Sequence, residues 1–165
     1  MQEPIAQETS KSDLYAQLAA QLSSLLAGER DLIANAANFS SLIFHSLPDL
    51  NWAGFYFVKD NELLLGPFQG QPACVRIAMG KGVCGTAAAE GVTTIVPNVH
   101  EFPGHIACDS ASNSEIVVPL VKGERLIGVL DLDSPLLARF DEVDAEGLNR
   151  LIALLVASTG ISEIA

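Results

Sequence analysis

The sequence predicts one α+β domain in which a central, mostly antiparallel sheet is flanked by helices. Its 165 residues, 49% of them apolar, suffice for a single hydrophobic core and are too few for two comfortable domains. Apolar residues recur at helical spacing near both ends of the chain. Between these helices, short apolar runs separated by turn-forming stretches indicate hairpins, whose strands pair in antiparallel fashion.

Residues 1–12 are polar, and we expect them to form a loose segment ahead of a domain that spans residues 13–160. Ser12 suits the N-cap of a first helix that ends near Gly28. The apolar face of this helix carries Leu14, Leu18, Leu22 and Leu25. A second helix runs from about residue 30 to residue 46 and stops before Pro48. Its apolar face carries Leu32, Ala36, Phe39 and Ile43.

The period of the pattern changes at Trp52. The elements expected next are strands over 52–58, 62–68 and 75–78, a helix over 83–90 and a strand over 92–96. Residues 97–113 then show no pattern of their own, and so long a connection inside a compact domain is usually functional. A second hairpin, 115–121 with 126–133, precedes a last helix that Asp141 caps and that ends near Gly160.

The acidic composition argues against two classes of partner. Twenty acidic and nine basic residues give a net charge of −11, which repels nucleic-acid phosphates and anionic lipid surfaces. No apolar run approaches the length of a membrane span. We therefore expect neither nucleic acid nor a membrane as partner.

Three cysteines, Cys74, Cys84 and Cys108, stand in a C-x9-C-x23-C pattern. An odd number cannot close a complete disulfide framework, and with no secretory signal in view we expect reduced thiols in the cytoplasm. Cys84 lies in the first turn of a helix, whose dipole would make it the most acidic thiol. Cys108 lies in the long loop, where exposure suits a nucleophile, and Cys74 lies at a strand edge. Position alone leaves their roles open.

Three carboxylates are predicted to share one face of the second hairpin. Asp131 and Asp133 are two residues apart in a strand, and a three-residue turn at 122–124 would place Glu115 directly opposite Asp131. Carboxylates this close raise one another's pKa, so one of them could remain protonated near neutral pH and act as an acid. The alternative is a solvated face of an edge strand.

Trp52 and Tyr56 share one face of the first strand and could line an apolar pocket with polar tips, although core packing is the simpler interpretation. A metal site is a further alternative, because His100, His105 and Cys108 form H-x4-H-x2-C. The chain has no C-x2-C pair and these spacings are loose, so metal binding ranks third, after the two functions that are described at the end of this subsection.

Seven motifs together resemble the free methionine-(R)-sulfoxide reductases, which are stand-alone GAF-domain enzymes. They are N-W-A-G-F-Y (51–56), G-P-F-Q-G (66–70), P-A-C (72–74), G-V-C-G-T-A (82–87), F-P-G-H-I-A-C-D (102–109), S-E-I-V-V-P (114–119) and G-V-L-D-L-D-S (128–134). The resemblance extends from about residue 13 to residue 160 and implies a single GAF-like domain.

The resemblance also implies roles for the residues singled out above. Cys108 would be the attacking thiol and Cys74 the main resolving thiol, with Cys84 as a second partner. Glu115, Asp131 and Asp133 would form the polar side of the substrate site, with Glu115 or Asp133 as the proton donor. Trp52 and Tyr56 would form the apolar wall.

The implied reaction is reduction of free methionine (R)-sulfoxide, with thioredoxin-type recycling and no cofactor or metal. Asp131 would pair with the substrate ammonium, while backbone N–H groups around residues 105–108 would hold its carboxylate. By analogy with the family we also expect a homodimer. The leading alternative is a non-catalytic GAF module that binds a small ligand or senses redox state.

Overall fold

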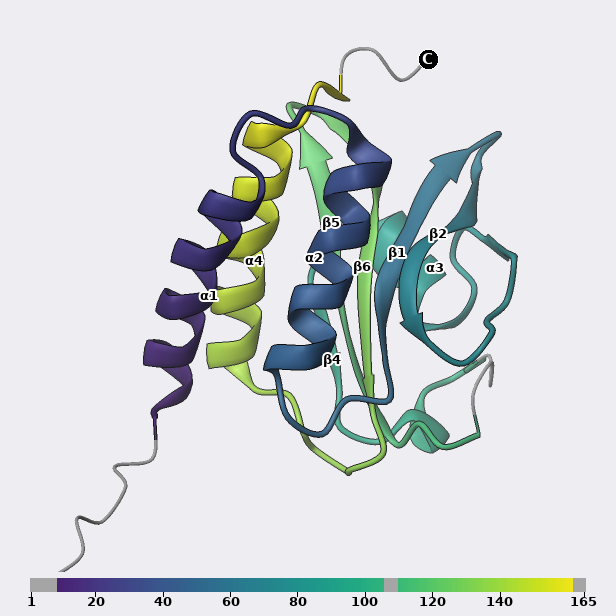
Figure 1. The fold of residues 1–165 in the computed structure, drawn as a ribbon. Coiled ribbons are helices and arrows are strands. Elements are labelled where there is room, and N and C mark those ends of the chain that lie inside the picture. Colours follow the sequence, from purple (N-terminus) through teal and green to yellow (C-terminus); the bar gives the residue numbers. More distant parts are fainter. Residues whose placement is uncertain (1–8, 106–109, 162–165) are drawn as a thin grey trace, which may run out of the picture.

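The computed structural model describes residues 9–105 and 110–161, and an antiparallel sheet lies at its centre (Figure 1). Within these residues the sheet has six strands in the order β3-β2-β1-β6-β5-β4. Their bounds are β1 Trp52–Lys59, β2 Glu62–Gly70, β3 Arg76–Ala78, β4 Thr94–Val96, β5 Ser114–Lys122 and β6 Arg125–Ser134. Every neighbouring pair is antiparallel, which confirms the predicted α+β class.

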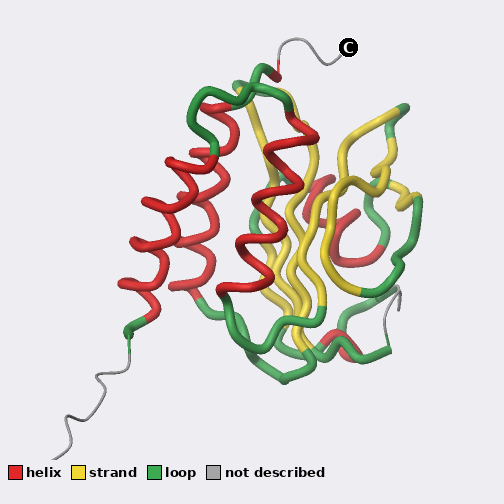
Figure 2. Tube along the Cα trace, viewed as in Figure 1, coloured by secondary structure: helices red, strands yellow, loops and turns green. Residues whose placement is uncertain are grey.

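The helices divide between the two faces of the sheet (Figure 2). On one face lie α2 (Leu32–Ser46) and α4 (Glu142–Ser158), with α1 (Lys11–Leu25) packed on α4. On the other face lies the short helix α3 (Gly82–Glu90). No helix in the described part of the chain is long and apolar enough to cross a membrane.

Side chains alternate between two separate cores, as the strand patterns predict. Ala53 and Phe55 of β1 belong to the core beneath α2 and α4. Trp52 and Tyr56 belong to the core beneath α3. On β6, Leu130 and Leu132 face the first core, whereas Val129 faces the second. The acidic face of β6 is therefore the face that α3 covers.

The start of the first helix differs from the prediction. Helix α1 begins at Lys11, and the Oγ atom of Ser10 accepts a hydrogen bond from the backbone N–H of Asp13, so Ser12 is not the N-cap. Both serines suit a cap, but the earlier one places Lys11 in the helix, where it pairs with Asp144 at 2.7 Å. Leu25, predicted on the apolar face, is 43% exposed.

The loop over residues 97–113 also contains a 3₁₀ turn, η1 (Val99–Glu101), that the sequence did not predict. The predicted last helix is confirmed: Asp141 caps α4 through a capping box. The helix buries Leu148, Leu151, Ile152 and Leu155, as expected.

Candidate active site

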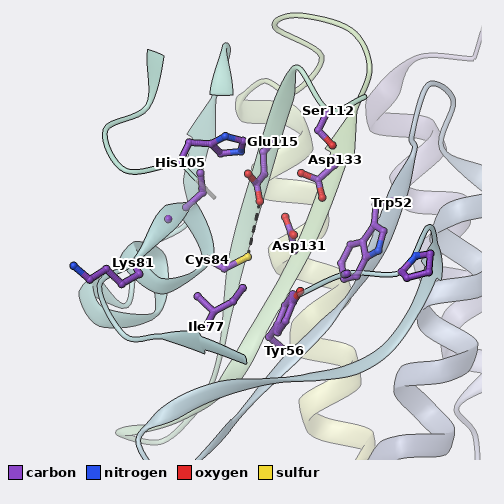
Figure 3. Close-up of a pocket in the computed structure, with 14 residues that line it drawn as sticks. Trp52, Tyr56, Ile77, Lys81, Cys84, His105, Ser112, Glu115, Asp131 and Asp133 are labelled. Atoms are coloured by element: carbon purple, nitrogen blue, oxygen red, sulfur yellow. Dashed lines mark hydrogen bonds between the residues drawn. The ribbon is translucent and has the colours of Figure 1, made fainter. Parts of the chain in front are cut away.

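A cavity of about 50 Å³ lies on the α3 side of the sheet (Figure 3). A single water occupies roughly 10–15 Å³ by this measure, so the cavity can admit a small polar group. It is lined by Trp52, Tyr56, Pro72, Ala73, Ile77, Lys81, Gly82, Val83, Cys84, His105, Ser112, Glu115, Asp131 and Asp133. The structure thus brings together the predicted aromatic wall, the three carboxylates and one cysteine.

The aromatic wall consists of Trp52 and Tyr56, whose rings stack with centroids 6.0 Å apart. Both rings are buried, and each anchors the loop between β2 and β3. Trp52 Nε1 donates a hydrogen bond to the carbonyl of Gln71 at 3.1 Å, and the Tyr56 hydroxyl donates to the carbonyl of Cys74 at 2.9 Å. Burial, together with nearby Asp131, raises the pKa of Tyr56, so its phenol remains a donor. These rings therefore position the segment that carries Cys74.

The three carboxylates do share one face, but their register differs from the prediction. Glu115 lies opposite Asp133, and Val117 lies opposite Asp131. The hairpin turn contains two residues instead of three, since Lys122 pairs with Arg125, and the register shifts once more between Leu120 and Val121. The two one-residue changes add up to two, so the same side chains stay on the same face.

Burial makes these carboxyl groups poor anions. Glu115, Asp131 and Asp133 are 5%, 6% and 8% exposed, which contradicts the alternative of a solvated face. Burial raises the pKa of Asp131 well above its usual value, and the charges of Asp133 and Glu115 raise it further. Burial also raises the pKa of Glu115, although a side-chain hydrogen bond with Asp131 and the electrostatic influence of His105 oppose that shift. The cluster can therefore hold protons near neutral pH.

Cys84 is the opposite of the acidic thiol that its helical position predicted. Its side chain is 5% exposed, and its Sγ atom donates to Glu115 Oε2 at 3.9 Å. Burial raises the pKa of this thiol well above its usual value, and Asp131 and Glu115 raise it further. Desolvation and neighbouring carboxylates thus outweigh the helix dipole, and the ranking of Cys84 as the likeliest thiolate is wrong.

Comparison with known proteins gives this fold and site a family. The GAF domain family matches residues 35–157. Free methionine-R-sulfoxide reductase of Escherichia coli is 52% identical over 146 residues, which are 88% of each chain. The enzyme of the same name from Saccharomyces cerevisiae is 45% identical over 154 residues, covering 88% of this chain and 86% of the yeast one.

A solved structure agrees. The X-ray structure of free methionine-R-sulfoxide reductase from Neisseria meningitidis in complex with its substrate superposes with a TM-score of 0.88 at 45% identity, covering 96% of this chain and 95% of that one. This chain belongs to the free methionine-R-sulfoxide reductases of the GAF domain family. The resemblance read from the motifs is thereby confirmed.

Of the other two cysteines of this free methionine-R-sulfoxide reductase, the structure describes Cys74 but not Cys108. Cys74 is half-buried in the loop between β2 and β3 and is disulfide-bonded, whereas Cys84 is a free thiol. Cys108 lies outside the described residues. The Cys74–Cys108 pairing therefore remains a prediction, as does a substrate-carboxylate site on the backbone of residues 105–108.

Three polar residues of the reductase pocket were not assigned to it from the sequence: Lys81, His105 and Ser112. From the sequence, the His105 side chain appeared only in the metal alternative, and its backbone only in the predicted substrate-carboxylate site; its ring lies 6.5 Å from that of His100. Figure 3 shows the Lys81 amine directed away from the carboxylates. Two sequence signals pointed to His105: the F-P-G-H-I-A-C-D motif and the H-x4-H-x2-C spacing.

Proposed function

We propose that this chain reduces free methionine (R)-sulfoxide to methionine with its own thiols. The observation that carries the proposal is the two-sided pocket of a family member: buried aromatic rings face a buried cluster of carboxyl groups. A substrate that combines an apolar S-methyl group with an ammonium group and a sulfoxide oxygen matches both sides.

The chemistry needs a thiolate and a neutral acid at one sulfur atom. The Cys108 thiolate attacks the sulfoxide sulfur, and a carboxylic acid protonates the sulfoxide oxygen, which passes to Cys108 as methionine leaves. The raised pKa of Glu115 supports its role as that acid, and Asp133, its cross-strand partner, is the alternative donor. Cys108 remains as a sulfenic acid.

Recycling then forms and reduces a disulfide. The sulfenic acid condenses with the thiol of Cys74, which releases water and leaves a disulfide that a thioredoxin-type dithiol reduces. Cys74 suits this role because it is half-buried on a loop and already disulfide-bonded. Cys84 suits it less, because it is buried and its raised pKa disfavours the thiolate.

Asp131 supports selectivity for the free amino acid. Its Oδ1 atom is buried and has no hydrogen-bond partner in the part of the chain that the structure describes. An α-ammonium group would satisfy this oxygen, and a peptide-bound methionine lacks that group. Preference for the R epimer rests on the family alone.

Methionine release by cysteine variants tests the thiol roles. With one equivalent of reduced enzyme, Cys108→Ser should release no methionine, because the nucleophile is absent. Cys74→Ser should release one equivalent and then stall under thioredoxin recycling. Stoichiometric release by Cys108→Ser would refute the assignment, and full turnover by Cys74→Ser would transfer the resolving role to Cys84.

Substrate competition tests selectivity. Free methionine (R)-sulfoxide should react at least about 5-fold faster than its N-acetyl derivative, since an unpaired buried carboxylate costs roughly 1–3 kcal/mol. Asp131→Asn should narrow that ratio, mainly by raising KM for the free amino acid. Equal rates for free, N-acetylated and peptide-bound sulfoxides would contradict the role of Asp131.

A further inference from the structure

Three residues that line the cavity, Cys84, Glu115 and Asp131, form a group that could bind a metal ion; we call them the cavity floor. One ligand atom from each of these side chains lies within 4.8 Å of the other two, and all three residues are buried. They come from α3, β5 and β6, so packing of the helix on the sheet holds them together. This set differs from the H-x4-H-x2-C set considered from the sequence.

The spacing suits a small tetrahedral ion. Zn²⁺ binds thiolate sulfur at about 2.3 Å and carboxylate oxygen at about 2.0–2.2 Å, so a tetrahedral site holds sulfur and oxygen roughly 3.5–3.7 Å apart. Cys84 Sγ and Glu115 Oε2 are 3.9 Å apart. A contraction of a few tenths of an ångström would therefore bring this pair to coordination geometry.

Asp131 supplies an independent indication that the cavity floor awaits a positively charged group. It is 6% exposed and lines the cavity, and its Oδ1 atom has no hydrogen-bond partner among the described residues. Leaving such an oxygen unsatisfied is costly, and a cation bound beside it removes that cost. The cavity itself leaves room for the fourth ligand that tetrahedral zinc takes.

The donor set selects among metals. Mg²⁺ and Ca²⁺ prefer sites made entirely of oxygen, with six or more ligands for Ca²⁺. A thiolate combined with two carboxylates suits a borderline-soft ion that accepts four ligands, which describes Zn²⁺.

We propose that Zn²⁺ binds Cys84, Glu115 and Asp131 and inhibits the enzyme by occupying the place of the substrate ammonium group. Inhibition rests on the proposed function, whereas zinc binding does not. The site gives Cys84 a role that the thiol cycle does not require.

Calorimetric titration with Zn²⁺ tests binding without any reference to activity. The full chain with Cys74→Ser and Cys108→Ser retains Cys84 as its only cysteine. This background should bind one Zn²⁺, and an added Cys84→Ser or Asp131→Ala should weaken binding at least about 10-fold. Glu62→Gln is the control: it removes a carboxylate on β2 that pairs with Arg76 and does not line the cavity, and it should change the Kd less than about threefold. Absence of saturable binding, or undiminished binding by Cys84→Ser, would overturn the proposal.

The absorption spectrum of bound Co²⁺ identifies the ligands directly, so it distinguishes loss of the thiolate ligand from a general loss of affinity in a destabilised variant. In the Cys84-only background, Co²⁺ should show intense tetrahedral bands and a thiolate charge-transfer band, and Cys84→Ser should lose the latter. A weak octahedral spectrum without charge transfer would exclude coordination by Cys84.

Single-turnover methionine release tests the inhibition. Added Zn²⁺ should inhibit the reduced enzyme competitively with the sulfoxide, and a chelator should restore activity. Because Cys74 and Cys108 are also thiols in that enzyme, the inhibition constant should match the Kd of the Cys84-only background. Zinc that binds the Cys84 site without slowing an active enzyme would refute inhibition, whereas an inactive enzyme that binds zinc would refute only the proposed function.

Discussion

The side chain of Asp131 is buried, with an exposed fraction of 6%. This burial raises its pKa well above the value of 3.8 that an aspartate has in an unfolded chain. The folded state therefore holds the Asp131 proton more tightly than the unfolded state does. This contribution to stability is fully present below the unfolded pKa and is lost as pH rises through the folded pKa. At neutral pH the residue prepared for the substrate ammonium thus opposes folding.

Asp131→Asn should make the protein more stable at neutral pH, because an amide cannot ionise. Each unit of pKa elevation is worth about 1.4 kcal/mol, so we expect a gain of at least about 1 kcal/mol near pH 8. The gain should shrink toward about pH 3, below the unfolded pKa, where Asp131 is mostly protonated in the unfolded state as well as in the folded state. Urea unfolding at both pH values, with a chelator present, measures the difference. A gain that does not depend on pH would contradict this account.

The residue scale also marks where prediction from the sequence succeeded and failed. The period of two along β6 placed Asp131 and Asp133 on one face, and that prediction is confirmed. The predicted cross-strand partner of Glu115, Asp131, was wrong. The length of the turn and the register shift depend on backbone geometry that the sequence of residues 122–124 does not specify. The prediction that Cys84 is the most acidic thiol was wrong, because segments distant in the sequence pack over the side chain, and the resulting desolvation raises its pKa.

At the scale of elements, Asn113 joins the end of the long loop to two neighbouring segments. Its Oδ1 atom lies 2.9 Å from His100 Nε2, and its Nδ2 atom donates to the carbonyl of Pro135 at 2.8 Å. Its backbone N–H donates to Ser134, and its carbonyl accepts from Val99. The loop thus ends at a residue that fixes both η1 and the segment after β6.

Asn113→Ala should slow single-turnover methionine release by about 10-fold or more. The substitution removes both side-chain bonds of Asn113, so the loop ends shift, and an error of about 1 Å in catalytic geometry can cost about 100-fold. Asn149→Ala is the matched control, since Asn149 also makes two side-chain bonds, to Thr93 and Ala145, but lies on α4. Equal rates for the two variants would show that Asn113 does not position the loop.

Element boundaries were predicted best where several local signals agree. Asp141 is followed by Asp144, which completes a capping box, and the predicted start of α4 is correct. Ser10 and Ser12 both suit the N-cap of α1, and contacts with α4 decide between them. The 3₁₀ turn η1 is only three residues long, too short to show a period.

At the scale of the whole molecule, a polar contact attaches α1 to the start of α4. Asp144 is 1% exposed and accepts hydrogen bonds from Tyr15 Oη and Lys11 Nζ, each at 2.7 Å. Arg139 lies 3.5 Å from the same carboxylate. The predicted domain boundary at residue 13 would therefore remove a partner of a buried charge, and we propose that the folded unit begins at Ser10.

Two truncations test this boundary. A chain that begins at Thr9 keeps Ser10 and Lys11 and should unfold in urea with the same free energy as the full chain. A chain that begins at Asp13 loses the N-cap bond to Asp13 and both Lys11 ion pairs, so its free energy of unfolding should fall by about 1–3 kcal/mol. Lys11→Met in the full chain separates the two causes: it removes the ion pairs and leaves the Ser10 cap, so it should lose only part of that amount. If the chain that begins at Asp13 were as stable as the full protein, the boundary at residue 13 would stand and the contact between Lys11 and Asp144 would contribute nothing measurable.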